Sequence, residues 1–230
     1  MENKISGIDP KATLSSIVKT FQAVIRDPAS FYQQMPRSGG YADPLVFVMV
    51  VGIAAGIVRA VLSPLTSIGH GFFAAAVSAI IVMPILTGLF SFVAAAILFL
   101  IWQLMGSQQP YEVSYRCAAY AMAIAPVAAA IHFIPYLGAV ASLAWMAFIY
   151  VCASVEVHRI KPKTALIVFG AIFVIFAVGS VSLQHTARSI QHKMDSLGKR
   201  LGEIEKMPPG EAGQAVGEFL KGMEKGLDKK

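Results

Sequence analysis

The sequence predicts an all-α fold, a polytopic transmembrane helix bundle with five spans. Hydrophobic residues make up 56% of the 230 residues and charged residues only 14%, whereas a soluble domain has about 25% charged residues. Nearly uninterrupted apolar blocks fill the chain between Pro44 and Gln184. A bilayer core about 30 Å thick requires about 20 apolar residues of helix, and each block can supply this length. These observations exclude a soluble core.

The five blocks run approximately over residues 45–64, 72–105, 117–133, 137–155 and 164–184. The second block is too long for one upright span, because a helix of that length extends about 50 Å at 1.5 Å per residue. It either tilts or breaks at Pro84. A break would leave 72–83, which is too short to cross and has no polar turn after it, so we expect one helix kinked at Pro84.

The segment before the first block predicts N-terminal interfacial helices. Its apolar residues recur at helical spacing, namely Ile17, Val18, Phe21, Val24 and Ile25. Asp27 and Pro28 then form the N-cap and first turn of a second, short helix. Two interpretations remain open: the pair lies on the membrane surface, or its apolar faces pack on the bundle.

The C-terminal segment predicts an amphipathic helical tail. Apolar residues alternate steps of four and three, as in a heptad pattern: Leu183, Ala187, Ile190, Met194, Leu197, Leu201 and Ile204. The tail either continues the fifth helix as a stalk or forms an oligomerising coiled coil. Met207-Pro208-Pro209-Gly210 then interrupts the helix. The domain organisation we expect is 1–40 interfacial, 41–184 transmembrane and 185–230 tail.

Charge indicates location and partners. The net charge of +6 comes from Lys and Arg in the N-terminal segment, one short loop and the tail, which suits contact with anionic lipid headgroups and not a nucleic-acid groove. The loops around Ser67 and Pro135 carry no Lys or Arg, so the positive-inside rule places them on the outer side. We therefore expect a cytoplasmic N terminus in the cell (inner) membrane and a C terminus on the opposite side.

Small residues and a tight turn predict how the spans pack. Gly52, Gly56 and Ala60 form a small-residue stripe suited to close helix contact. The Ile134-Pro135-Tyr136 turn makes the third and fourth spans antiparallel, which brings Arg116 near Glu156 and predicts a structural ion pair. The same register brings Cys117 near Cys152, and both thiols are expected to be reduced packing residues.

Residues able to carry chemistry are few. The sequence lacks the signatures of zinc proteases, α/β-hydrolases, phosphate-binding loops and paired intramembrane carboxylates, so we expect neither an enzyme nor a cofactor. His70, His132 and His185 lack ligand spacing, and no metal site is predicted. Arg59, Pro84 and Pro126 form a candidate polar path through the bundle, although an arginine near a helix end also extends its side chain to the interface.

Several fragments together resemble the Ypt-interacting-protein (Yip) domain family of integral membrane proteins, in its bacterial branch. These fragments are Asp27–Tyr32, Tyr41–Leu45, Tyr111–Arg116, Tyr120 with Ala125–Pro126, Ile134–Gly138 and Glu156–His158. The resemblance covers about residues 20–184, and its specificity lies in the order and spacing of short fragments around the five blocks. It implies a five-span helical bundle with a cytoplasmic N terminus.

The resemblance also suggests a function. Eukaryotic relatives bind Rab-type GTPases and reticulon-like partners in vesicle traffic or membrane shaping. The N-terminal segment here is short and lacks their long polar region, which argues against GTPase binding. We expect a non-enzymatic scaffold that organises or shapes the membrane, contacting lipids and recruiting protein partners or a second copy. The alternative hypothesis is a channel or carrier for a lipid or small solute.

Overall fold

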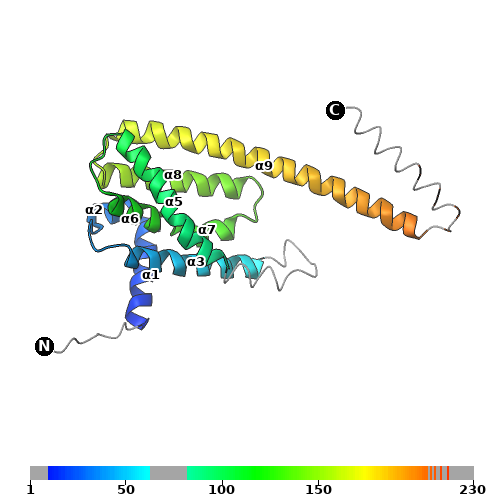
Figure 1. Ribbon diagram of the computed structural model, residues 1–230, viewed down its shortest axis with the longest axis horizontal. Coiled ribbons are helices and arrows are strands. Elements are labelled where there is room, and N and C mark those ends of the chain that lie inside the picture. The colour runs from blue at the N-terminus through cyan, green and yellow to red at the C-terminus, as the bar shows by residue number, and fades with distance from the viewer. Residues whose placement is uncertain are drawn as a thin grey trace. The chain divides into compact units, whose positions relative to one another are not determined.

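The computed structural model describes residues 10–62 and 82–206, together with positions 208, 210, 213 and 217. Within these residues all regular structure is helical, and no strand occurs. The helices are α1 (Pro10–Arg26), α2 (Pro28–Gln34), α3 (Ala42–Leu62), α5 (Met83–Leu104), α6 (Tyr111–Ala121), α7 (Ile124–Ile131), α8 (Leu137–Glu156) and α9 (Pro162–Glu205) (Figure 1). The predicted all-α fold class is confirmed.

Five segments of the described chain are long and apolar enough to cross a membrane. They are Ala42–Leu62, Pro84–Leu104, Tyr111–Ile131, Leu137–Glu156 and Pro162–Ile204. The prediction of a multi-pass transmembrane protein is thereby confirmed. The predicted kink at Pro84 involves residues 72–81, which lie outside the described residues; α5 begins at Met83, with Pro84 in its first turn, where its missing N–H leaves no hydrogen bond unmade.

The third span begins earlier than predicted. The expected block 117–133 started after Arg116, but the helix begins at Tyr111. Arg116 in this first part is buried against other parts of the protein, so its charge does not face lipid. The span is interrupted between α6 and α7, where Pro126 has no N–H to donate and its ring would clash with the Met122 carbonyl of a continuous helix.

The chain forms two compact units, Met1–Val181 and Ser182–Lys230. The core of the first unit contains large, fully buried side chains from several spans, among them Phe47, Trp102, Tyr115, Ile149 and Phe169. At Gly52 an added Cβ would lie 3.4 Å from the Pro84 Cα, so this glycine permits the close approach of α3 to α5. Gly56 is also buried, and Ala60 lies one turn further along α3.

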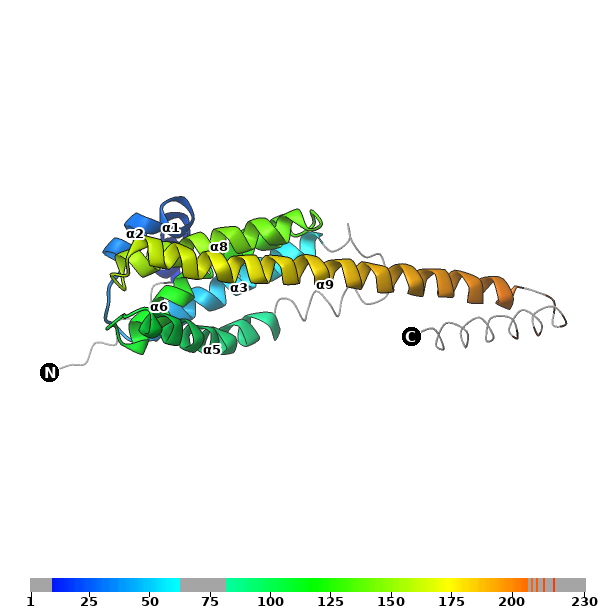
Figure 2. The same ribbon diagram turned by 90° about the horizontal axis from the view of Figure 1, so that it is seen from above.

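The helix α1 is part of the same core and not a separate appendage. Ile17 and Val24 of α1, and Tyr32 and Met35 after it, are buried together with residues of the spans. In Figure 1 α1 runs across the direction of α3 and α8, and Figure 2 shows it nearly end-on. One apolar face of α1 therefore packs on the bundle, as the second interpretation of this segment expected.

The helix α9 runs without interruption from Pro162 to Glu205. The last span therefore continues into the heptad region and ends just before Met207-Pro208. Within the second unit the heptad residues Leu183, Ile190 and Met194 are exposed in the single chain. Self-association of the tail and the expected domain boundaries stay predictions.

Candidate functional site

The N-terminal helices are tied to the third span by two side chains. The backbone N–H of Ser30 donates to the Asp27 Oδ1 at 3.0 Å, which caps α2. Hydrogen bonds from Ser30 also lower the pKa of the Asp27 carboxyl. The buried Tyr32 hydroxyl donates to the Cys117 carbonyl oxygen at 2.9 Å, and burial raises the pKa of this tyrosine well above its usual value. The position of α2 on α6 is set by this buried bond.

A polar clamp on α6 holds the loop between α2 and α3. The Gly40 N–H donates to the Glu112 Oε1 at 2.7 Å, while the Arg116 Nη1 donates to the Gly40 carbonyl at 3.0 Å. The Arg116 Nε donates to the Pro36 carbonyl at 2.9 Å. Glu112 and Arg116 are four residues apart and share one face of α6. We call this arrangement the Gly40 clamp, since both backbone groups of Gly40 are bound.

The loop can follow this path because two glycines stand at its tightest point. Gly39 and Gly40 have φ angles of +123° and +75°, a region that side chains with a Cβ rarely adopt. An added Cβ at Gly39 would also lie 3.5 Å from the Arg116 Nη1. The sequence Ser38-Gly39-Gly40 therefore permits the backbone to wrap closely around the guanidinium.

Aromatic side chains support the clamp on its other side. The Phe92 and Tyr115 rings are stacked with centroids 4.3 Å apart, and Tyr41 meets Tyr115 edge-on at 5.3 Å. The Tyr111 hydroxyl donates to the Phe92 carbonyl at 2.8 Å. These contacts join the start of α3, the middle of α5 and the start of α6, and such pairs add stability beyond their buried area.

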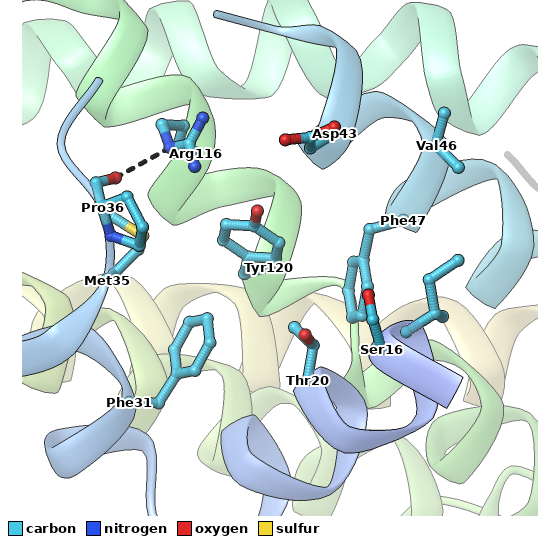
Figure 3. Close-up of a pocket in the computed structure, with 11 residues that line it drawn as sticks. Ser16, Thr20, Phe31, Met35, Pro36, Asp43, Val46, Phe47, Arg116 and Tyr120 are labelled. Atoms are coloured by element: carbon cyan, nitrogen blue, oxygen red, sulfur yellow. Dashed lines mark hydrogen bonds between the residues drawn. The ribbon is translucent and has the colours of Figure 1, made fainter. Parts of the chain in front are cut away.

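A pocket of about 630 Å³ opens beside the clamp, between α1, α2, α3 and α6. Arg116 and Asp43 lie on opposite sides of the pocket, and the Tyr120 hydroxyl points into the space between them (Figure 3). Phe31 and Phe47 flank the Tyr120 ring, each edge-on with centroids 5.3 Å apart. The lining of the pocket thus combines two opposite charges with an aromatic floor.

A second buried polar cluster joins the ends of α5 and α8. The Trp102 Nε1 donates to the Ser154 Oγ at 2.8 Å, and the His158 ring stacks on Trp102 with centroids 4.0 Å apart. The His158 Nδ1 is 2.7 Å from the Ser107 Oγ. Burial, with a smaller effect from Arg37, lowers the pKa of His158 to about 3, so this ring is neutral at physiological pH.

The residues singled out from the sequence have the following places. The Arg116 guanidinium donates to two backbone carbonyls of the loop between α2 and α3, and the backbone carbonyl of Glu156 accepts a hydrogen bond from the Arg37 Nη2 at 3.4 Å. Among the described residues, no hydrogen bond joins Arg116 to Glu156, and the ion pair between them stays a prediction. Cys117 and Cys152 are buried free thiols.

The candidate polar path also stays a prediction. Arg59 is exposed in the last turn of α3, Pro84 is buried in the first turn of α5, and Pro126 is half-buried in α7. His132 directly follows the end of α7 and His185 lies on α9, and both are exposed, while His70 lies outside the described residues. Within the residues described, no group of three or more His, Cys, Asp or Glu side chains could hold a metal ion.

The clamp and the pocket were not predicted from the sequence. The signal was present, since Glu112 and Arg116 stand one turn apart at the start of a span and a Gly-Gly pair precedes another span. Three of the six fragments that carried the family resemblance meet at this site, together with Tyr120 of a fourth: Asp27–Tyr32, Tyr41–Leu45 and Tyr111–Arg116.

Comparison with known families covers the part of the chain that forms this site. The family model of the Yip1 domain matches residues 23–183, a range that includes the clamp, the aromatic contacts and the buried polar cluster. No curated protein and no solved structure matches the chain significantly.

Proposed function

This chain belongs to the Yip1-domain family, and on that premise we propose that it is a non-enzymatic membrane scaffold that bends or organises the bilayer and recruits partners. We place its N terminus in the cytoplasm and its C terminus on the opposite side of the membrane, an orientation that the five candidate spans of the described residues support by their odd number. Its contacts are with lipids and with protein partners or a second copy. The observation that carries the proposal is the placement of α1.

The helix α1 has three distinct sides. Ile17 and Val24 are buried in the bundle, whereas the neighbouring apolar side chains Leu14 and Val18 are 56% and 45% exposed. Lys19 and Arg26 are exposed on the side opposite the buried stripe. A helix with an apolar flank and a basic flank is suited to the boundary between acyl chains and anionic headgroups.

The attachment of α1 turns this flank into a wedge. Since α1 runs across the spans (Figure 1), upright spans place it parallel to the membrane plane. Its buried side fixes it to the bundle, so Leu14 and Val18 enter one leaflet at a depth set by the protein. Added volume in one leaflet favours a curved bilayer. A freely tethered helix would pay a larger ordering cost for the same insertion.

The test uses the purified full chain in liposomes. The double substitution Leu14→Ser with Val18→Ser removes the apolar flank, which contributes roughly 1 kcal/mol per half-buried side chain, and leaves the buried stripe intact. We expect tubulation and preference for small vesicles to fall strongly. The matched control is Ala23→Ser, an exposed position on the polar side of α1, and it should behave as the native protein.

The same liposomes also test the competing function, a channel or carrier. A channel or carrier would give lipid scrambling or solute flux that is lost on Arg59→Ala. Undiminished curvature activity in the Leu14/Val18 variant, or flux of this kind, would refute the scaffold proposal. Curvature without flux would support it.

A further inference from the structure

We infer that the pocket beside the Gly40 clamp binds the headgroup of a zwitterionic aminophospholipid, with its phosphate at Arg116 and its ammonium at Asp43. This inference concerns a binding site and holds whether or not α1 bends the membrane. It rests on the two opposite charges that line the pocket, the aromatic floor and the depth of the pocket in the bundle.

Arg116 is prepared for an anionic partner. A guanidinium has five N–H donors in a fixed fork, and the bonds to the Pro36 and Gly40 carbonyls engage two of them. The side chain is only 3% exposed and still lines the pocket. Because the clamp already fixes the Arg116 side chain, a phosphate can bind the remaining N–H groups of the guanidinium with little further loss of side-chain entropy.

Asp43 selects against a simple anion. It lies across the pocket from Arg116 (Figure 3), so a phosphate or sulfate alone would meet a carboxylate on the opposite side. A ligand that carries a cation a few bonds from its phosphate satisfies both charges. The Tyr120 hydroxyl, which points between them, supplies a further hydrogen bond to the phosphate oxygens.

The aromatic floor suits the remainder of such a ligand. The Phe31, Tyr120 and Phe47 rings present apolar surface to the glycerol and the first carbons of the acyl chains. Aromatic faces also attract an ammonium group. A pocket of about 630 Å³ is within the size range of small-molecule sites, which runs from about 300 to 1,000 Å³.

The depth of the pocket favours a lipid over a soluble aminophosphate. Asp43 is the second residue of the span Ala42–Leu62, and Arg116 is the sixth residue of the span Tyr111–Ile131. At 1.5 Å per residue both lie within about 8 Å of the start of their spans. This is the level of headgroups and glycerol, where lipid is present at far higher local concentration than a soluble ligand.

The test measures which lipids the purified full chain retains, by native mass spectrometry with phosphatidylethanolamine, phosphatidylcholine and phosphatidylglycerol of equal acyl chains. We expect phosphatidylethanolamine to be retained roughly tenfold better than the other two, the ratio expected for one charge-assisted hydrogen bond. Phosphatidylcholine lacks N–H donors for Asp43, and phosphatidylglycerol lacks the cation. Free phosphoethanolamine is added as a competitor.

Substitutions at Asp43 make the inference falsifiable without disturbing the clamp. Asp43→Asn should abolish the preference for phosphatidylethanolamine, and Asp43→Lys should reverse it in favour of phosphatidylglycerol. Asp195→Asn, an exposed carboxyl on α9, is the matched control and should change nothing. An unchanged lipid ratio in Asp43→Asn overturns the inference. Equal affinity for free phosphoethanolamine and for the lipid overturns the assignment to a lipid.

Discussion

Arg116→Ala should open the loop between α2 and α3 while the spans stay folded. In the native protein this side chain bonds the Pro36 and Gly40 carbonyls at 2.9 and 3.0 Å. Both acceptors belong to one short loop that Glu112 holds by a third bond. Arg37 is exposed within this loop, so trypsin can report its opening directly.

The expected size follows from the two bonds. Hydrogen bonds to a charged group contribute about 1.5–3 kcal/mol each, and the lower value suits a loop at the edge of the protein. Losing both lowers the free energy of local opening by about 3 kcal/mol. Since each 1.4 kcal/mol is a factor of ten, cleavage after Arg37 should become roughly 100-fold faster when cleavage follows the open population.

The assay is limited proteolysis in detergent, with mass spectrometry to identify the sites. Cleavage after Lys193 on α9 is the internal control and should keep its native rate. Arg116→Lys retains the charge, but a single ammonium does not reproduce the two-pronged geometry, so an increase of roughly tenfold is expected. Cleavage after Arg37 at the native rate in Arg116→Ala would refute the clamp.

Two further predictions concern stability. Gly138→Ala should lower the thermal unfolding midpoint sharply, because an added Cβ would overlap the Ile131 carbonyl and lie 3.0 Å from the His132 Cα. The control is Gly170→Ala, where an added Cβ meets open space, and its midpoint should stay at the native value. Equal midpoints for the two variants would contradict the packing of α7 on α8. The pKa of His158 is depressed to about 3 from near 6.5 when unfolded. Between these two pH values His158 binds a proton in the unfolded state but not in the folded state. The contribution of the neutral ring to the free energy of unfolding is therefore full above pH 6.5 and falls as the pH is lowered, by about 2 kcal/mol at pH 5. Unfolding midpoints from pH 7.5 to 5 should show this loss, and His158→Gln should flatten it.

Some elements follow from local sequence because lipid imposes a simple demand. A segment of about 20 apolar residues must be helical to satisfy its own backbone in hydrocarbon, which explains why the spans α3, α8 and α9 were predicted well. Asp27-Pro28 likewise determines the start of α2 through a local cap. The start of the third span was predicted too late, at 117, because hydropathy alone cannot distinguish a charge that faces lipid from one that binds a loop of the protein.

Composition and the spacing of residues within single segments were enough to predict the membrane environment, the five apolar blocks, the family and the amphipathic character of α1. Contacts between segments were not predictable in this way. They include the bonds from Arg116 to Pro36 and Gly40, the packing of α1 in the core, and the pocket that Asp43 and Arg116 share. These contacts join residues about 70 to 100 positions apart in the chain. The register and approach of packed helices determine such pairs, and neither is encoded in the periodicity of a single segment.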